Sequence, residues 1–140
     1  MSLTQQQIHL IQSSFAKVKP SAMQAAEIFY DTLFEYDPSL ESIFHGDMKS
    51  QGEKLMRTLD TAVSSLSNLD ALLPVLEALA VRHVQYQVQP KDYTTVGNAL
   101  LATLSKGLGD EFTPVVRQAW VDGFRLIAKV MKSAAYPDAA

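Results

Sequence analysis

The hydrophobic positions of this chain recur at helical spacing from one end to the other. Apolar residues three or four apart form successive stripes, each typical of one face of an amphipathic helix. No segment alternates apolar and polar residues with the period of two that a half-buried strand shows. The pattern therefore predicts an all-α chain of about seven helices. We expect one domain over residues 1–140, with 133–140 as a frayed tail.

Each predicted helix is defined by its stripe of apolar or buried positions. In chain order the stripes comprise Ile8, Ile11, Phe15 and Val18; Ala22, Ala26, Phe29, Tyr30 and Leu33; Ile43 and Phe44; Leu55, Leu59, Ala62 and Leu66; Leu72, Leu76, Leu79 and His83; Tyr93, Val96, Gly97, Leu100, Leu101, Leu104 and Leu108; and Val116, Trp120, Gly123, Phe124, Ile127 and Met131. The polar, glycine-containing stretch HGDMKSQG at 45–52 is expected to be a loop that is too short for a further helix.

Polar residues and prolines mark where several of these helices begin. Thr4 and Gln7 have the spacing of a capping box, in which two side chains satisfy two free backbone N–H groups. Asp37 and Thr113 each precede a proline, which is the usual order of an N-cap and a first helical residue. Asp70 is expected to cap the helix that carries His83.

Composition narrows the class of protein. The 140 residues are 47% hydrophobic and 19% charged, which is typical of a globular domain. The net charge of -3 argues against nucleic acid as a partner. The absence of cysteine excludes disulfides, thiolate metal sites and cysteine nucleophiles. We find no signal peptide and no membrane span, and we therefore expect a cytoplasmic protein.

Common catalytic motifs are missing from the sequence. Without cysteine or an HExxH motif, a zinc site has little support. There is no GxSxG motif for a serine hydrolase and no glycine-rich phosphate loop of standard spacing. Glu27, Asp31 and Glu35 form an acidic ladder at intervals of four, which we interpret as a solvated helix face.

The three histidines differ in their surroundings. His9 and His45 lie in polar segments and are expected to be solvated. His83 instead extends an apolar stripe, so it is either a core side chain that hydrogen bonds to a carbonyl or a metal ligand. Haem iron is a metal for which one imidazole suffices. A haem would also need an opposite wall with a few polar groups, for which Tyr30 and Gln51 are candidates.

Several blocks, in order, carry a family resemblance: FYDTLFEYDPSLESIF, QGEKL, RHVQYQVQPKDYTTVGNALLATL and QAWVDGFRLIAKVM. Through them the chain resembles the globin family, in particular single-domain bacterial haemoglobins and the globin domain of flavohaemoglobins. The resemblance implies a globin fold with a short loop in place of the fourth helix. It also implies haem b as cofactor and O2, NO and CO as ligands.

The resemblance assigns roles to individual positions. It implies His83 as the iron ligand, Phe44 against the porphyrin plane, Tyr30 and Gln51 as distal polar groups, Leu55 as an aliphatic wall, and Tyr93 as a proximal residue that orients the histidine.

Further cofactor contacts are expected around these positions. Apolar candidates for the cavity lining are Leu79, Val88, Val96 and Trp120, although Trp120 equally fits a plain core role. Lys54 and Arg82 would reach the haem propionates, or else remain solvated with their stems over the rim.

One position departs from the family pattern. Where flavohaemoglobins carry a glutamate behind the proximal histidine and tyrosine, the matching position here is Ala135. Because a carboxylate partner makes a ligating imidazole more basic, its absence argues against peroxidase-like chemistry.

Several functions remain open at this point. The primary expectation is a protein that binds O2 reversibly and with high affinity, either as a monomer or as a weak homodimer. One alternative is an NO dioxygenase that works with an external reductase. A haem-based gas sensor and a helical protein without haem are further alternatives; no sensor output domain is expected in this chain.

Overall fold

The protein is described by a computed structural model that covers residues 3–44, 47–85 and 91–135. Within these ranges, seven side chains are left undescribed: those of Ile43, Leu69, Arg82, His83, Val84, Gln85 and Ala135.

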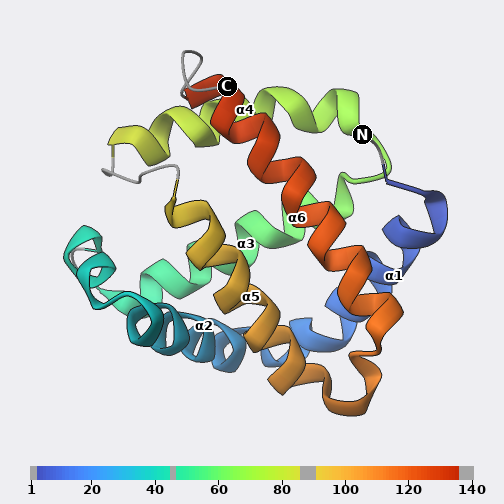
Figure 1. Ribbon diagram of the computed structural model, residues 1–140, viewed down its shortest axis with the longest axis horizontal. Helices are drawn as coiled ribbons and strands as arrows, with labels where there is room; N and C mark the ends of the chain where they lie inside the picture. Colours follow the sequence, from blue (N-terminus) through green and yellow to red (C-terminus); the bar gives the residue numbers. More distant parts are fainter. Residues whose placement is uncertain (1–2, 45–46, 86–90, 136–140) are drawn as a thin grey trace.

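Six α-helices and three short 3-10 helices make up the described part of the chain (Figure 1). In order they are α1 (Gln5–Val18), η1 (Lys19–Ser21), α2 (Ala22–Tyr36), η2 (Pro38–Ile43), α3 (Met48–Ser64), α4 (Leu69–Gln85), α5 (Asp92–Leu108), η3 (Gly109–Glu111) and α6 (Pro114–Ala135). The prediction of an all-α chain is confirmed, and its short third helix is a 3-10 helix. No helix of the described ranges is long and apolar enough to cross a membrane.

The predicted helix starts are confirmed at three places. The Gln7 amide N–H donates to Thr4 Oγ1 at 3.0 Å and the Thr4 N–H donates to Gln7 Oε1 at 3.1 Å, which completes the capping box of α1. Asp37 Oδ1 accepts from the Ser39 N–H at 3.1 Å at the start of η2. Thr113 Oγ1 accepts from the Val116 N–H at 3.3 Å at the start of α6.

Three boundaries differ from the sequence prediction. The expected loop over 45–52 ends early, because Asp47 accepts from the Lys49 N–H at 3.0 Å and α3 begins at Met48. Helix α4 begins before Asp70, and Asn68 Oδ1 rather than Asp70 accepts from a first-turn N–H, that of Ala71 at 3.4 Å. Helix α6 continues through residue 135, so residues 133–135 are helical rather than frayed. Residues 136–140 lie outside the described part.

The helices pack in two groups that share a common interior. Helix α2 lies against α5 and α3, and α6 lies against α4 and α1. In Figure 1, α5 and α6 cross the near face, α4 follows the upper edge and α2 lies at the lower left. Because each stripe of apolar positions faces inward, one hydrophobic core joins all six α-helices.

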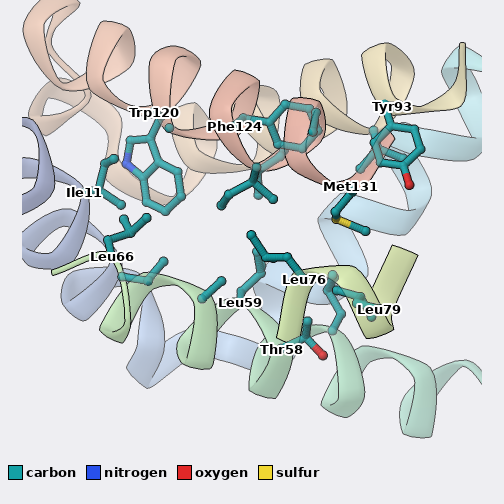
Figure 2. A pocket seen from close by; sticks show the side chains of 18 of the residues that line it. Ile11, Thr58, Leu59, Leu66, Leu76, Leu79, Tyr93, Trp120, Phe124 and Met131 are labelled. Carbon is teal, nitrogen blue, oxygen red and sulfur yellow. The ribbon is translucent and has the colours of Figure 1, made fainter. Parts of the chain in front are cut away.

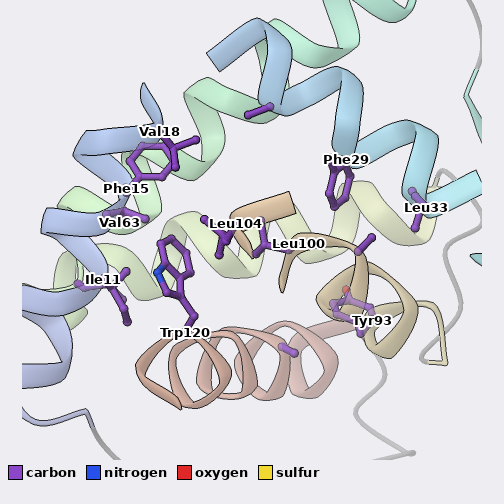
Figure 3. Close-up of a cluster of buried hydrophobic side chains, with 14 of the residues drawn as sticks. Ile11, Phe15, Val18, Phe29, Leu33, Val63, Tyr93, Leu100, Leu104 and Trp120 are labelled. Carbon is purple, nitrogen blue, oxygen red and sulfur yellow. The ribbon is translucent and has the colours of Figure 1, made fainter. Parts of the chain in front are cut away.

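Trp120 is a fixed point of this core (Figure 3). Its indole Nε1–H donates to Ser14 Oγ at 2.8 Å, and Ser14 Oγ–H in turn donates to the Leu10 carbonyl at 2.6 Å. The Phe15 ring lies beside the indole at a centroid distance of 6.4 Å. A buried indole N–H needs such a partner, so Ser14 ties α6 to α1 at this point.

Gly97 allows α5 and α6 to approach closely. A Cβ at position 97 would lie 2.7 Å from Cε2 of Phe124, closer than real contacts permit. Gly107, on the same helix, has room: a Cβ there would lie 3.6 Å from Cγ2 of Val18. The crossing of α5 and α6 therefore depends on glycine at one position and not at the other.

We expect Gly97→Ala to lower the free energy of unfolding by about 1–3 kcal/mol, since the added methyl group must displace a packed ring. The control Gly107→Ala should leave stability unchanged or raise it by up to about 1 kcal/mol, because alanine favours the helix. Urea denaturation of the two variants measures both effects. Equal stability of the two variants would contradict the close crossing.

Candidate functional site

The six α-helices leave an apolar cavity of about 170 Å³ between them (Figure 2). Its lining is Ile11, Phe29, Leu55, Thr58, Leu59, Ala62, Val63, Leu66, Leu76, Leu79, Tyr93, Val96, Leu100, Trp120, Gly123, Phe124, Ile127, Ala128 and Met131. Almost every side chain in this set is aliphatic or aromatic. A cavity of this apolar character is typical of a site for a mostly apolar guest.

Five residues predicted to contact the cofactor or its ligand line this cavity. Leu55 comes from α3, Leu79 from α4, Tyr93 and Val96 from α5, and Trp120 from α6. Four helices therefore bring together positions that are far apart in the sequence. Trp120 is 5% exposed and also forms part of the cavity wall.

A buried tyrosine and a half-buried glutamine form a polar pair next to the cavity. The Tyr30 hydroxyl and the Gln51 side chain share a hydrogen bond, and Tyr30 is only 6% exposed. Phe29, the neighbour of Tyr30 on α2, and Leu55, one turn after Gln51 on α3, both belong to the lining. The two predicted distal groups are thus close together, at the edge of the apolar space.

Burial sets the protonation state of Tyr30. Removal from water raises the pKa of the hydroxyl above its ordinary value of 10.0, and the hydrogen bond to Gln51 lowers the pKa by a smaller amount. The net effect is a raised pKa. Near neutral pH the hydroxyl therefore keeps its proton and is available as a hydrogen-bond donor.

Gly52 allows close packing of α2 and α3, the helices that carry Tyr30 and Gln51. A Cβ at position 52 would lie 3.0 Å from Cβ of Ala26, at the limit of real contacts. Two small residues therefore let α2 and α3 pack closely, one residue away from Gln51. This close approach places the amide of Gln51 within reach of the Tyr30 hydroxyl.

Two aromatic rings also pack against Tyr30. The Phe44 ring contacts the Tyr30 ring edge-on at a centroid distance of 5.2 Å, and the Phe34 ring stacks on it at 6.0 Å. Phe44 also meets Phe34 at 5.6 Å. Phe44 was predicted at this site from the sequence, and Phe34 was not. Its position four residues after Tyr30 on the same helix face was the signal that could have identified it.

Of the other predicted cofactor contacts, Lys54 is the one whose side chain is described, and it lies on the surface. Lys54 is exposed on α3, where its carbonyl accepts from the Thr58 hydroxyl at 2.8 Å. His83 and Arg82 belong to α4, but their side chains are not described. Val88 and His45 lie outside the described residues. His9 is exposed, as predicted.

The sequence pattern did not indicate how much of the lining comes from the stripes of α3 and α6. Leu59 and Ala62 on α3 and Leu66 in the turn after it face the cavity, together with Phe124 and Met131 on α6. Their helical spacing did predict a buried face. Spacing alone does not distinguish a face that fills a core from one that borders a cavity.

Comparison with known proteins places this chain among haem proteins. A family model described as Globin matches residues 27–131. The flavohemoprotein of Vibrio cholerae is 30% identical over 131 residues, which cover 91% of this chain and 33% of that protein. The flavohemoprotein of Halalkalibacterium halodurans is 34% identical over 105 residues, which cover 73% of this chain and 26% of that protein. The chain thus spans about a third or less of the curated relatives it matches.

A solved structure of similar shape is an engineered carbene transferase from Rhodothermus marinus, provisionally named a nitric oxide dioxygenase. It matches with a TM-score of 0.87 and 22% identity, over 99% of this chain and 96% of the other. The likeness confirms the fold predicted from the sequence.

The raised pKa of Tyr30 predicts an alkaline loss of stability. Above about pH 10 the unfolded chain loses the tyrosine proton while the folded protein still holds it. This contribution to stability is complete below the unfolded pKa and is lost as the pH rises through the folded pKa. Tyr30→Phe should therefore reduce the fall in unfolding free energy between pH 9 and 11, as measured by urea denaturation.

The control is Tyr36→Phe, because Tyr36 is 51% exposed. It should leave the alkaline fall as it is in the parent protein. If both variants gave the same pH profile as the parent, burial of the Tyr30 hydroxyl would not be coupled to folding.

Proposed function

The chain belongs to the globin family, and from this premise we propose that it binds haem b and that the loaded protein reversibly binds O2, NO and CO. The proposed role is high-affinity oxygen binding, for storage or delivery. The observation that carries the proposal is the hydrogen-bonded pair of buried Tyr30 and half-buried Gln51 beside an apolar cavity. Such a pair offers hydrogen-bond donors where a small polarised ligand would lie.

The residues of the site fit a haem group. Haem is a flat, largely apolar ring with two carboxylates at one edge, and it needs an apolar cavity with few polar groups. When bound, it supplies an iron atom that takes a diatomic ligand. We propose His83 as the iron ligand. The proposed contacts of the ring are Phe44, Leu79, Val88, Tyr93, Val96 and Trp120, with Lys54 and Arg82 near the carboxylates.

Tyr30 and Gln51 supply the distal hydrogen bonds. Because its pKa is raised, the Tyr30 hydroxyl keeps a proton to donate, and the Gln51 amide carries two more. Each hydrogen bond to a partly charged ligand atom contributes about 1–3 kcal/mol. Two such bonds would slow ligand release by a factor on the order of 10 to 10⁴. Slow O2 release and high affinity follow from this pair.

The proximal side supports ligand binding rather than peroxide chemistry. Tyr93 lines the cavity from α5, in the position from which we propose that it orients His83. Residue 135, at the end of α6, is alanine and has no carboxylate to polarise an imidazole. The imidazole of His83 would then be less basic than one that is hydrogen-bonded to a glutamate.

A second candidate function is NO dioxygenation with an external reductase. It is favoured by the relatives named flavohemoprotein and by the fold neighbour provisionally named a nitric oxide dioxygenase. In this reaction NO and O2 combine with one electron from the reductase to give nitrate. Rapid mixing of the oxygenated protein with NO distinguishes the two functions. Sustained turnover with an added reductase supports the enzyme, whereas a single stoichiometric reaction supports oxygen binding.

The iron ligand is tested by His83→Ala. We expect this variant to lose most of its haem, or to retain haem with an altered absorption spectrum, because the iron loses its only proposed side-chain ligand. Absorption spectra of the ferric, deoxy and CO forms provide the measurement. His9→Ala, at an exposed position, is the matched control and should keep the parent spectrum. Full haem content and an unchanged spectrum in His83→Ala would show that His83 does not hold the iron.

The distal donor is tested by Tyr30→Phe. Loss of the hydroxyl should speed O2 dissociation at least several-fold, because one hydrogen bond to the ligand is removed. Stopped-flow replacement of O2 by CO gives the rate. Tyr36→Phe removes an exposed hydroxyl and should leave the rate unchanged. Equal rates in both variants would mean that Tyr30 does not donate to the ligand.

A further inference from the structure

An open groove of about 800 Å³ follows one face of α5. Small-molecule sites in proteins commonly enclose roughly 300–1,000 Å³, so this groove is large enough for such a ligand. We call it the outer groove and define it by the polar side chains that line it, which are those of Tyr36, Thr95, Asn98, Ser105 and Arg117.

The outer groove and the apolar cavity lie on opposite faces of α5. Thr95, Asn98 and Ser105 recur at intervals of three and seven residues and therefore share one side of the helix. Val96 and Leu100 lie on the other side, where they line the cavity. The two linings have no described residue in common. The outer groove is therefore a separate space that lies outside the proposed haem site.

The five polar side chains of the outer groove are available to a ligand. On the buried side of α5, the Thr103 hydroxyl donates to the Ala99 carbonyl at 2.8 Å and is thereby satisfied within the helix. Within the described ranges, none of the five polar side chains has such a hydrogen-bond partner. Their hydroxyl, amide and guanidinium groups therefore face water and can exchange it for a ligand.

Arg117 supplies a positive charge that no carboxylate of the described chain neutralises. The ion pairs of this part join Lys17 to Glu111 at 2.7 Å and Lys19 to Asp60 at 3.1 Å. Glu111, six residues before Arg117, is therefore engaged elsewhere. The described lining of the groove contributes no acidic side chain. A guanidinium in this setting favours an anion, and its planar fork matches the two oxygens of a carboxylate.

The charge of the protein favours a ligand with a single negative charge. The whole chain carries a net charge of -3, so a molecule with several phosphates would be repelled by the protein as a whole and attracted by one residue. A carboxylate on a small, otherwise uncharged body is repelled much less and still pairs with Arg117.

The floor of the outer groove is apolar and in part aromatic. Leu101 and Phe112 are half-buried and pack against the hydrophobic core, which fixes their positions. Ala102 adjoins Leu101 on α5 and leaves room in the groove, because its side chain is a single methyl group. Tyr36, at the end of α2, is 51% exposed and adds an aromatic side wall. Aromatic side chains contact flat rings by stacking or edge-on packing, so this surface fits an aromatic ligand.

We propose that the outer groove is a binding site for a small aromatic monocarboxylate. Arg117 pairs with the carboxylate, and the ring lies on the apolar floor beside Phe112. The side chains of Thr95, Asn98 and Ser105 form hydrogen bonds with polar substituents of the ring. The site requires no haem, so this inference goes beyond the proposed oxygen-binding function and does not rest on it.

The probe is p-hydroxyphenylacetate, and the neutral p-hydroxyphenylacetamide is its matched control. Each is titrated into the CO form of the haem-loaded protein, in which haem fills the cavity and excludes the probe from it, and backbone amide shifts are followed by NMR. The acid should shift the amides of Asn98, Ala102 and Arg117 along one saturable curve. The neutral probe should bind at least fivefold more weakly, because it lacks the charge. Absence of saturable shifts at these positions, or equal affinity of the two probes, would overturn the proposal.

Arg117→Gln tests the charge, because it keeps a polar side chain and removes the guanidinium. It should weaken binding of the acid at least fivefold. Arg125→Gln makes the same change at an exposed position of the same helix, outside the groove lining, and should keep the parent affinity. Equal losses in the two variants would indicate a general attraction between charges and would contradict the assignment to Arg117.

Ala102→Leu tests the floor by filling the space above it. This variant should bind the acid at least fivefold more weakly than the parent, because the ring loses its place. Ala71→Leu makes the same change at an exposed position of α4 and should keep the parent affinity. Parent affinity in Ala102→Leu would contradict the position of the ring on the floor.

The proposed function and the outer groove can fail separately. If the protein bound no haem, the proposed function would fail. The same titration of the haem-free protein, compared between the parent and Arg117→Gln, would still decide whether the outer groove binds the carboxylate.

Discussion

The fold is governed by one constraint: six helices pack around an apolar space that their own side chains do not fill. Protein interiors are normally close-packed, and an unfilled cavity costs about 24 cal/mol per Å³. For a cavity of about 170 Å³ this amounts to roughly 4 kcal/mol, which is large beside the stability of about 5–15 kcal/mol that is typical of a whole domain. A bound guest would offset this free-energy cost by restoring contacts with the lining. The cavity therefore fits an apolar ligand.

Helical periodicity predicts most of the architecture because each stripe reports a face that must be buried. It does not report what that face meets. Leu59 and Ala62 have the same spacing whether they fill a core or border a cavity, and the difference depends on helices far away in the sequence. The predicted start of α4 was wrong because two nearby polar residues could cap the helix. Asn68, rather than Asp70, supplies the acceptor.

The residues of the candidate site could be predicted from the sequence, but the packing that brings them together could not. Family resemblance selected Tyr30 and Gln51, and their side chains share a hydrogen bond. Their contact depends on Gly52, a residue that belongs to no recognised motif. Gly52 allows α2 and α3 to approach until a Cβ would lie 3.0 Å from Ala26. The spacing of Phe34 four residues after Tyr30 could have indicated their contact, but the contact of both rings with Phe44 depends on the fold.

The most direct test of this account is a titration of the haem-free protein with haemin, followed at the Soret band and by thermal unfolding. A guest that fills the cavity of the folded state must stabilise that state. We predict saturation at one haem per chain, together with a rise in melting temperature. The control Ala71→Leu, at an exposed position of α4, should show the same rise. A linear absorbance response without saturation, at an unchanged melting temperature, would contradict the claim that this cavity is built for haem.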